Sequence, residues 1–274
     1  MRDAWQVKSD VEDAAAYTVF SQDRIWNGYS IADLDPPFRP YTEVAIGQQD
    51  DQPAAAACLV LRHPAFCSVV PHGAPEGVAA ILAKIALPET TYLLAQPAHV
   101  PPFRQHYVIN GGDEMLRMAV SAATFQAPAD SSAQATRLEH GDLAALRRLY
   151  LHYPGNAFND DQLIHGIFYA IRDGDEIVAA GGTHAMAARY GIAAIGNIFT
   201  RPDLRGRGLG QAAVAALTAD LLNGAGRDVI LNVSAANDVA RRIYERLGFR
   251  AHCRYWEGDV KRKIKDTPAE MMVS

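Results

Sequence analysis

The feature that most constrains this fold is a strand that leads through a proline into a glycine-rich loop, which then opens a helix. Residues 198–211 read IFTRPDLRGRGLGQ. The first turn of a helix carries unpaired backbone N–H groups and a partial positive charge. Glycines leave that backbone uncovered, and Arg205 and Arg207 add positive charge beside it. The pattern therefore predicts a pyrophosphate-binding loop between a strand and a helix.

Other interpretations of the loop compete with this one. A glycine cluster at the start of a helix is often only a tight turn. A Rossmann fingerprint needs G-x-G-x-x-G/A, but in the frame that starts at Gly206 the last position is Gln211. A Walker loop needs Gly-Lys-Ser/Thr, which the sequence lacks.

A second helix is predicted after a short apolar strand, within NVSAANDVARRIYERLGF at residues 232–249. Asn237 is a natural N-cap. Gly248 fits the left-handed position after a helix, and Phe249 fits the apolar contact that follows it. Tyr244 shares a helical face with Leu247. By itself this pattern indicates only a well-capped helix packed on a core.

Together, the two motifs resemble the GNAT superfamily of N-acyltransferases, in the order R-x-x-G-x-G and then N-x6-Y-x2-L-G-F. The match runs from about residue 135 to residue 261. The residues that fill the motifs are Arg205, Gly208, Gly210, Asn237, Tyr244, Leu247, Gly248 and Phe249. The sequence IGNIFTRPDLRGRGLG at residues 195–210 also resembles a branch of acetyltransferases that has an extra N-terminal domain. In that branch, the N-terminal domain is similar to a partial copy of the same fold.

The resemblance implies roles for the matching residues. The backbone of Ile198, Phe199 and Thr200 would pair with the pantetheine arm of acetyl-CoA. The Asn237 side chain would contact the pantetheine or adenosine end, and Tyr244 would stand near the thioester sulfur. The cofactor-binding loop would comprise Arg205, Gly206, Arg207, Gly208, Leu209, Gly210 and Gln211.

Direct attack of an amine on a thioester sets further expectations. The carbonyl oxygen gains negative charge, for which a strand amide near Ile198 or Phe199 is a suitable donor. The leaving thiolate needs a proton, and Tyr244 is the expected general acid. Three residues on or beside the strands expected to flank the active-site cleft are candidates for the general base: His184, Glu139 and Glu257. His184 is favoured because histidine titrates near neutral pH. Asn197 and Asn232 either position the amine or a water, or form ordinary hydrogen bonds at strand ends.

Composition bears on partners and compartment. The net charge is −5, and the first 50 residues carry the whole acidic excess, which disfavours nucleic acid as a partner. No apolar run reaches the length of about 18 residues that a membrane span needs. The first residues lack a signal-peptide core, so a cytoplasmic location is expected. The three cysteines and the histidine spacings predict isolated thiols and no metal site.

The predicted fold class is α/β, with a mixed sheet and two domains. The polar stretch 126–135 divides an N-terminal α+β domain (1–130) from a GNAT-like domain (135–262) and a tail (263–274). The N-terminal domain has no R-x-x-G-x-G and is not expected to bind coenzyme A. In the second domain, antiparallel strands lead into strand 192–200, helix 209–222, strand 229–233, helix 239–247 and strand 249–256, and the sheet is expected to splay between 192–200 and 229–233.

The expected function is N-acetylation of an amine, a small molecule or an amino-acid derivative, with acetyl-CoA as co-substrate. Transfer would occur in a ternary complex, without a metal, in a monomer or a homodimer. A non-catalytic acyl-CoA-binding sensor or interaction module is the main alternative. A third hypothesis makes the N-terminal domain the functional binding module.

Overall fold

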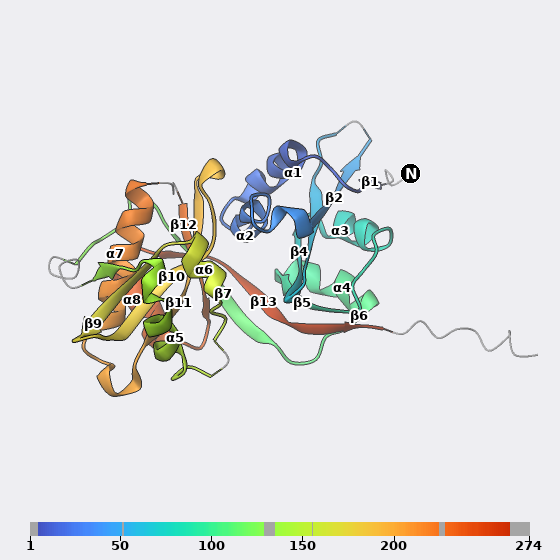
Figure 1. Cartoon of the computed structure of the whole chain (residues 1–274). Coiled ribbons are helices and arrows are strands. Elements are labelled where there is room, and N and C mark those ends of the chain that lie inside the picture. Colours follow the sequence, from blue (N-terminus) through green and yellow to red (C-terminus); the bar gives the residue numbers. More distant parts are fainter. Residues whose placement is uncertain (1–4, 51, 129–134, 155, 225–227, 264–274) are drawn as a thin grey trace, which may run out of the picture. The chain divides into compact units, whose positions relative to one another are not determined.

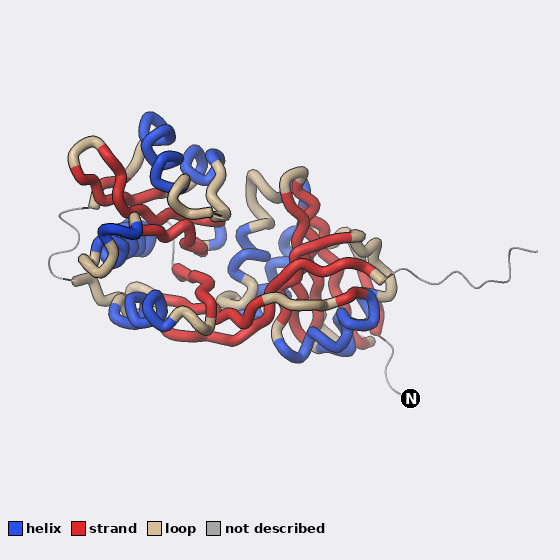
Figure 2. The backbone as a smooth tube through the Cα atoms, turned by 90° about the horizontal axis from the view of Figure 1, so that it is seen from below, coloured by secondary structure: helices blue, strands red, loops and turns tan. Residues whose placement is uncertain are grey.

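The computed structural model describes residues 5–50, 52–128, 135–154, 156–224 and 228–263. The chain forms two compact units. Unit 1 comprises Met1–Val19, Tyr41–Asp113 and Trp256–Ser274, and unit 2 comprises Phe20–Pro40 and Glu114–Tyr255. One long strand, β13 (Arg250–Arg262), begins in unit 2 and ends in unit 1 (Figure 1). Both units are built around strands (Figure 2).

These units do not follow the division predicted at residue 130. The stretch 126–135 lies within unit 2, with residues 129–134 outside the described part of the chain. Residues 20–40, hereafter segment 20–40, also belong to unit 2. The chain therefore returns to each unit, which local composition does not reveal.

Unit 1 holds a mixed sheet in the order β1-β2-β3-β4-β5-β13, with β6 also paired to β13. Among the described strands of this unit, β4 and β5 run parallel through two residue pairs, and the other neighbouring strands are antiparallel. The elements are β1 (Trp5–Lys8), α1 (Asp13–Phe20), β2 (Thr42–Gln49), β3 (Ala56–His63), β4 (Phe66–Gly73), α3 (Pro75–Leu82), β5 (Thr90–Ala95), α4 (Val100–His106) and β6 (Tyr107–Val108).

The turn into α3 differs from the glycine-rich loop at residues 205–211. Gly73 adopts a left-handed φ of 85°, and Pro75 follows as the first helical residue. Proline has no N–H, so this helix start offers one amide fewer than usual. A single alanine separates the two residues, and no arginine lies between β4 and α3. The α3 helix ends at Leu82, although apolar residues continue at helical spacing through Ile85.

Unit 2 has the strand order β13-β7-β12-β11-β10-β9-β8. The strands β8 to β11 are antiparallel, β11 and β12 are parallel, and β12 and β7 are antiparallel. The strands are β7 (Asp113–Val120), β8 (Thr136–Arg137), β9 (Phe168–Asp173), β10 (Glu176–Ala187), β11 (Ile192–Thr200) and β12 (Asp228–Ser234). The helices are α2 (Gly28–Ala32), α5 (Leu143–Tyr150), α6 (Asp160–His165), α7 (Leu209–Asn223) and α8 (Asp238–Arg246).

Two hydrophobic clusters define the faces of the unit 2 sheet. On the face that we call face A, Ile195, Leu231 and Val233 pack with Leu217 of α7 and with residues of α8. On the opposite face, face B, helices α5 and α6 pack against β9 and β10. The α2 helix also contacts β10 and β11, and a Cβ on Gly28 would overlap Ile230 and Ile192. Segment 20–40 therefore packs directly on the sheet.

Segment 20–40 also buries a carboxyl group, and this predicts a pH-dependent stability. Asp33 is 7% exposed, and burial raises its pKa from 3.8 to about 7. The folded state then binds more protons than the unfolded state between about pH 4 and pH 7, so the contribution of Asp33 to stability falls as pH rises through that window. The full difference amounts to about 4 kcal/mol.

The Asp33→Asn variant should lack this fall. Urea unfolding at pH 5 and pH 8 measures it: the wild type should lose stability relative to Asp33→Asn as pH rises. The comparison uses the difference between the two proteins, because His99 and His184, whose pKa values burial lowers, act in the opposite sense below about pH 6.5 in both. Parallel stability curves for the two proteins would show that Asp33 is already ionised at pH 5.

Candidate functional site

The strands β11 and β12 separate in the middle of unit 2. Their parallel pairing runs from Ile192 and Asp228 to Ile195 and Leu231. Beyond that point β11 continues to Thr200 along β10, whereas β12 continues along β7. The sheet therefore splays between these strands, as the sequence predicts.

A β-bulge coincides with the splay. Gly182 pairs with Gly196 and Ala180 with Phe199, so Asn197 and Ile198 together oppose a single residue of β10. Asn197 has a φ of 52°, uncommon for a residue other than glycine. A bulge bends its strand and increases the local twist. Here it accompanies the divergence of β11 from β12.

The glycine-rich loop follows the free end of β11. Gly206 and Gly208 have φ values of 80° and 78°, a region that L side chains rarely adopt. A Cβ on either glycine would meet no atom within 4 Å, so the space in front of the loop is open. Within the described chain, the amides of residues 206–211 donate no hydrogen bond, and the first backbone bond of α7 runs from Ala212 to Gly208. The loop thus presents a run of free amides.

Arginine and aromatic side chains flank this loop. The Arg205 guanidinium donates from Nε to the carbonyl of Thr200 at 3.3 Å, and its Cζ lies 5.6 Å from the centre of the Phe199 ring. Tyr153 stacks on Phe199 with centroids 4.9 Å apart. Arg207 is exposed. The positive charge beside the loop therefore adjoins an aromatic surface on β11.

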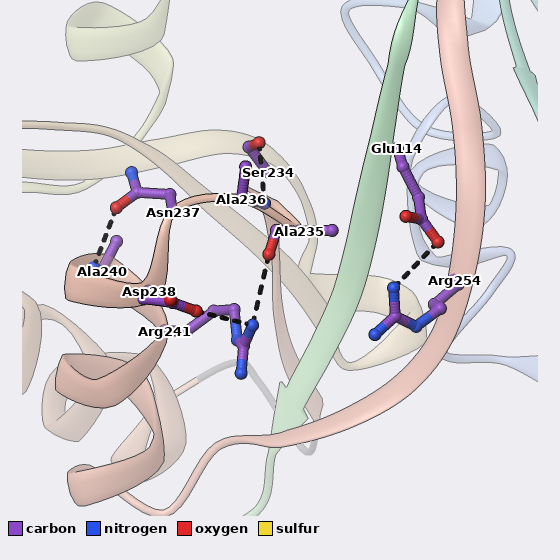
Figure 3. Close-up of polar contacts among 9 residues, drawn as sticks. All are labelled: Glu114, Ser234, Ala235, Ala236, Asn237, Asp238, Ala240, Arg241 and Arg254. Carbon is purple, nitrogen blue, oxygen red and sulfur yellow. Dashed lines mark hydrogen bonds and ion pairs between the residues drawn. The ribbon is translucent and has the colours of Figure 1, made fainter.

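The second motif forms the capped helix α8 after β12 (Figure 3). Asn237 accepts a hydrogen bond from the amide of Ala240 at 3.1 Å, so its side-chain oxygen serves as the helix cap. Arg241 donates to the carbonyl of Ala235 and to Asp238, which closes the turn between strand and helix. If Asn237 also contacts a ligand, its side-chain NH2 group is the part that remains for that role.

Tyr244 lies on the inner face of α8. It is 7% exposed and belongs to the face A cluster, with its ring 6.0 Å from that of Phe249. Burial, and then the nearby Tyr153, raise the pKa of its phenol above the usual 10.0. The hydroxyl forms no hydrogen bond with the residues that the structure describes. Tyr244 therefore holds its proton at neutral pH, with no acceptor for it among the described residues.

Comparison with known proteins decides the fold. A family model described as FR47-like protein matches residues 171–257. A GCN5-related N-acetyltransferase from Sphaerobacter thermophilus is 17% identical and superposes with a TM-score of 0.61, over 94% of this chain and 95% of its own. The chain has the GNAT fold. The splayed strands and the glycine-rich loop are therefore parts of a known fold.

Two further structures show the same GNAT fold. An acetyltransferase from the GNAT family of Novosphingobium aromaticivorans DSM 12444 is 22% identical, with a TM-score of 0.53 over 71% of this chain and 84% of its own. A tandem GNAT protein from the clavulanic acid biosynthesis pathway is 11% identical, with a TM-score of 0.57 over 94% and 98%. The likeness to a tandem protein covers both units. The comparison with curated proteins finds no match.

Of the three base candidates, His184 adjoins the splay of the GNAT sheet. A Cβ on Gly196 would lie 3.4 Å from the His184 Nδ1, so the imidazole covers the first residue of β11 beyond the paired region. Burial lowers the pKa of His184 below 6.5, which keeps the ring neutral at pH 7. Neither ring nitrogen forms a hydrogen bond within the described part of the chain. A neutral imidazole with a free nitrogen can accept a proton.

The other two candidates for the general base are the carboxylates of Glu139 and Glu257. Glu139 is exposed and follows the edge strand β8, with β9 and β10 between β8 and β11. Glu257 belongs to unit 1, where β13 pairs it with Leu94. Glu139 is thus two strands away from the splay, and Glu257 is a residue of the other unit.

The two asparagines that were predicted to position the amine or a water lie at different places. Asn197 donates from Nδ2 to Gln162 at 2.8 Å, and its carbonyl accepts from the Tyr150 hydroxyl. Asn232 directly follows the last residue of β12 that pairs with β11, and its Oδ1 accepts from Arg117 at 2.6 Å. Asn197 is thereby fixed between α5, α6 and the bulge, while Asn232 lies at the splay.

Sequence reasoning missed Arg117 and Tyr29. Arg117 interrupts the apolar run MLRMAV on β7, and a charge inside a buried strand is the signal that marks it. Tyr29 lies on a short helix that begins with glycine and was not predicted. Its ring is 4.9 Å from the Arg117 Cζ and 5.9 Å from the His184 ring. Tyr29 therefore contacts both groups.

Other site classes find no support in the described residues. No three His, Cys, Asp or Glu side chains among them group as metal ligands. The cysteines Cys58, Cys67 and Cys253 form no disulfide within the described residues, and each is buried or partly buried. No helix in the described ranges is long and apolar enough to cross a membrane.

Proposed function

We propose that this protein transfers an acetyl group from acetyl-CoA to an amine by direct attack in a ternary complex. The observation that carries the proposal is the junction of a splayed β11–β12 pair with a loop of unbonded amides at residues 206–211. Amides at a helix start bind phosphate oxygens, and the free edge of β11 can pair with the amide groups of a pantetheine arm. The free edge of β11 and the loop lie in one chain segment, only five residues apart.

The proposed roles follow the geometry. The loop amides and Arg205 bind the pyrophosphate, and the backbone of residues 198–200 lines the pantetheine arm. An ammonium acceptor must lose a proton before it attacks, which at a lysine-like pKa costs about 4–5 kcal/mol at neutral pH. His184, neutral and unbonded, accepts this proton on face B.

The covalent step then balances. The amine nitrogen forms a bond to the thioester carbon, and the carbon–sulfur bond breaks. Tyr244 donates its proton to the leaving thiolate, and regains one as the attacking nitrogen loses its second proton to solvent. The products are the N-acetyl amide and free coenzyme A, with one proton released overall.

Gly208→Ala tests the cofactor loop, with Gly174→Ala as a matched control. Both glycines have left-handed φ values, 78° and 59°, and open space around them, but Gly174 lies in the β9–β10 turn. Both variants should lose about 1–2 kcal/mol of stability. Only Gly208→Ala should weaken acetyl-CoA binding, by about 10- to 100-fold, because charge-assisted hydrogen bonds to the phosphates are lost.

Isothermal titration of acetyl-CoA into both variants measures this difference. Equal affinities in Gly208→Ala and Gly174→Ala would remove the loop from the binding site. Mass spectrometry of the intact protein after exposure to acetyl-CoA should show no added acetyl group, since transfer is direct. A stoichiometric acetyl adduct would contradict the ternary mechanism.

A further inference from the structure

Arg117 is a buried cation that forms no ion pair with the residues that the structure describes. It lies on β7 opposite Asn232, and 1% of its surface is exposed. Its Nε donates to Asn232 Oδ1 at 2.6 Å, and its Nη1 donates to the carbonyls of Trp26 at 2.6 Å and Ile25 at 3.2 Å. All three acceptors are neutral. Its Nη2 carries no hydrogen bond with any residue that the structure describes.

A role in packing accounts for only part of this arrangement. The contacts of Nε and Nη1 hold segment 20–40 against the sheet, and the guanidinium lies 5.2 Å from the Trp26 ring and 5.4 Å from the Tyr255 ring. Aromatic faces stabilise a cation modestly. A buried charge is costly unless a counter-charge accompanies it. The unbonded Nη2 and the uncompensated charge both point to an anionic ligand.

The position of Arg117 connects it to the splay. Its neighbours in sequence, Leu116 and Met118, belong to the face A cluster. Strand side chains alternate between faces, so Arg117 projects toward face B. The same reasoning places Asn232, which lies between Leu231 and Val233, on face B. Arg117 thus lies on the face opposite α7.

Tyr29 contacts both Arg117 and the proposed base, His184. Its ring lies over the Arg117 guanidinium and meets the His184 ring in an edge-to-face contact. His184 in turn covers Gly196, the first residue beyond the pairing of β11 with β12. A cation for binding and a neutral imidazole therefore lie near the splay, and one aromatic ring contacts both of them.

We propose that Arg117 binds the carboxylate of the acceptor, so that the substrate class is amines that carry a carboxylate, such as amino acids. This inference rests on the proposed acetyl transfer. A planar guanidinium matches a carboxylate in geometry and charge. With the carboxylate at Arg117 and Asn232, the amine of the same molecule is directed toward His184 and the splay.

Pairs of acceptors that differ only in the carboxylate test the proposal. Amino acids, their decarboxylated amines and their amides are compared by release of the coenzyme A thiol, with acetyl-CoA affinity measured in parallel. The wild type should prefer the carboxylate by about 10- to 100-fold in kcat/KM. Arg117→Met should lose that preference, while its acetyl-CoA affinity stays within about twofold of the wild type. Arg117→Lys should show an intermediate preference, because lysine keeps the positive charge but lacks the two-pronged donor geometry of a guanidinium.

Arg254→Met is the control, since Arg254 is an exposed arginine of the same unit, paired with Glu114. It should retain the preference of the wild type. Equal kcat/KM values for amino acid and decarboxylated amine in the wild type would overturn the proposal. So would a preference that survives in Arg117→Met. The wild-type comparison needs no variant and stands even if Arg117→Met fails to fold.

A binding measurement separates this proposal from the proposed reaction. N-acetylglycine and its neutral amide, N-acetylglycinamide, are titrated without acetyl-CoA, with fluorescence of Trp26, next to Arg117, as the signal. The acid should bind the wild type about 10-fold or more tightly than the amide, and Arg117→Met should bind both alike. Equal binding in the wild type overturns the carboxylate site. Discrimination without any acetyl-CoA binding would retain the site and reject acetyl transfer.

Discussion

Replacing Tyr244 by phenylalanine is expected to lower kcat by about 10²–10⁴-fold, the usual contribution of a positioned general acid. The phenol is held in its protonated form, because burial raises its pKa, and its hydroxyl has no hydrogen-bond acceptor among the described residues. Removing the hydroxyl therefore leaves no protein group unsatisfied. Stability should change by less than about 1 kcal/mol, and acetyl-CoA affinity should stay near that of the wild type.

Tyr107→Phe is the matched control for Tyr244→Phe. Tyr107 is a buried tyrosine of unit 1, whose hydroxyl donates to the carbonyl of Pro88 at 2.9 Å. Its loss should affect stability and leave kcat unchanged. Steady-state kinetics with a saturating acceptor decide the matter. If Tyr244→Phe turns over like the wild type, Tyr244 is a packing residue and the acid lies elsewhere.

Gly248→Ala is expected to destabilise the fold by about 2–5 kcal/mol. Gly248 follows α8 with a φ of 88°, where an L side chain costs about 1–2 kcal/mol. Its added methyl would also overlap the backbone carbonyl of Thr124, and such overpacking costs about 1–3 kcal/mol more. The backbone bonds from Gly248 to Glu245 and from Phe249 to Tyr244 leave the turn little freedom to adjust.

Denaturant unfolding measures this loss against Gly174→Ala. Gly174 also has a left-handed φ but open space around it, so the control isolates the clash from the backbone strain. Equal losses in the two variants would mean that the Thr124 segment moves aside freely. A larger loss in Gly248→Ala supports a rigid connection between α8, which carries Tyr244, and β13.

The motif region of the fold could be predicted closely from sequence. Strand β11 begins and ends where predicted, and α7 differs only by one residue at its end. Both are specified locally, by a continuous apolar run, a proline and a glycine loop. The predicted antiparallel strands before β11 and the predicted splay between β11 and β12 are confirmed as well.

The pairing between distant segments could not be predicted. Strand β7, from the first half of the chain, lies between β12 and β13, and β13 extends to Arg262 rather than to residue 256. Nothing in the local pattern of β7 identifies its partners, because apolar alternation specifies a face and not a neighbour. The short helix α2 begins with a glycine, which is a poor helix former, and its place depends on the packing of Gly28 against β11 and β12.

The same distinction holds for the candidate site. The loop at residues 205–211 and Tyr244 lie within sequence motifs and were identified from them. Arg117, Tyr29 and His184 come from three distant segments, and only the fold brings them together. His184 was one of three candidate bases, and its position beside Gly196 is the tertiary fact that now favours it.

Thermal unfolding with and without acetyl-CoA tests the central claim most directly. A ligand that binds only the folded state stabilises it by about 2.7 kcal/mol at 100 times its Kd. We predict this stabilisation for the wild type and for Tyr244→Phe, and a much smaller one for Arg205→Ala at the same concentration. An unchanged Tm of the wild type at millimolar acetyl-CoA would contradict the account, and the loop at residues 205–211 would then be a structural turn or a site for another anion.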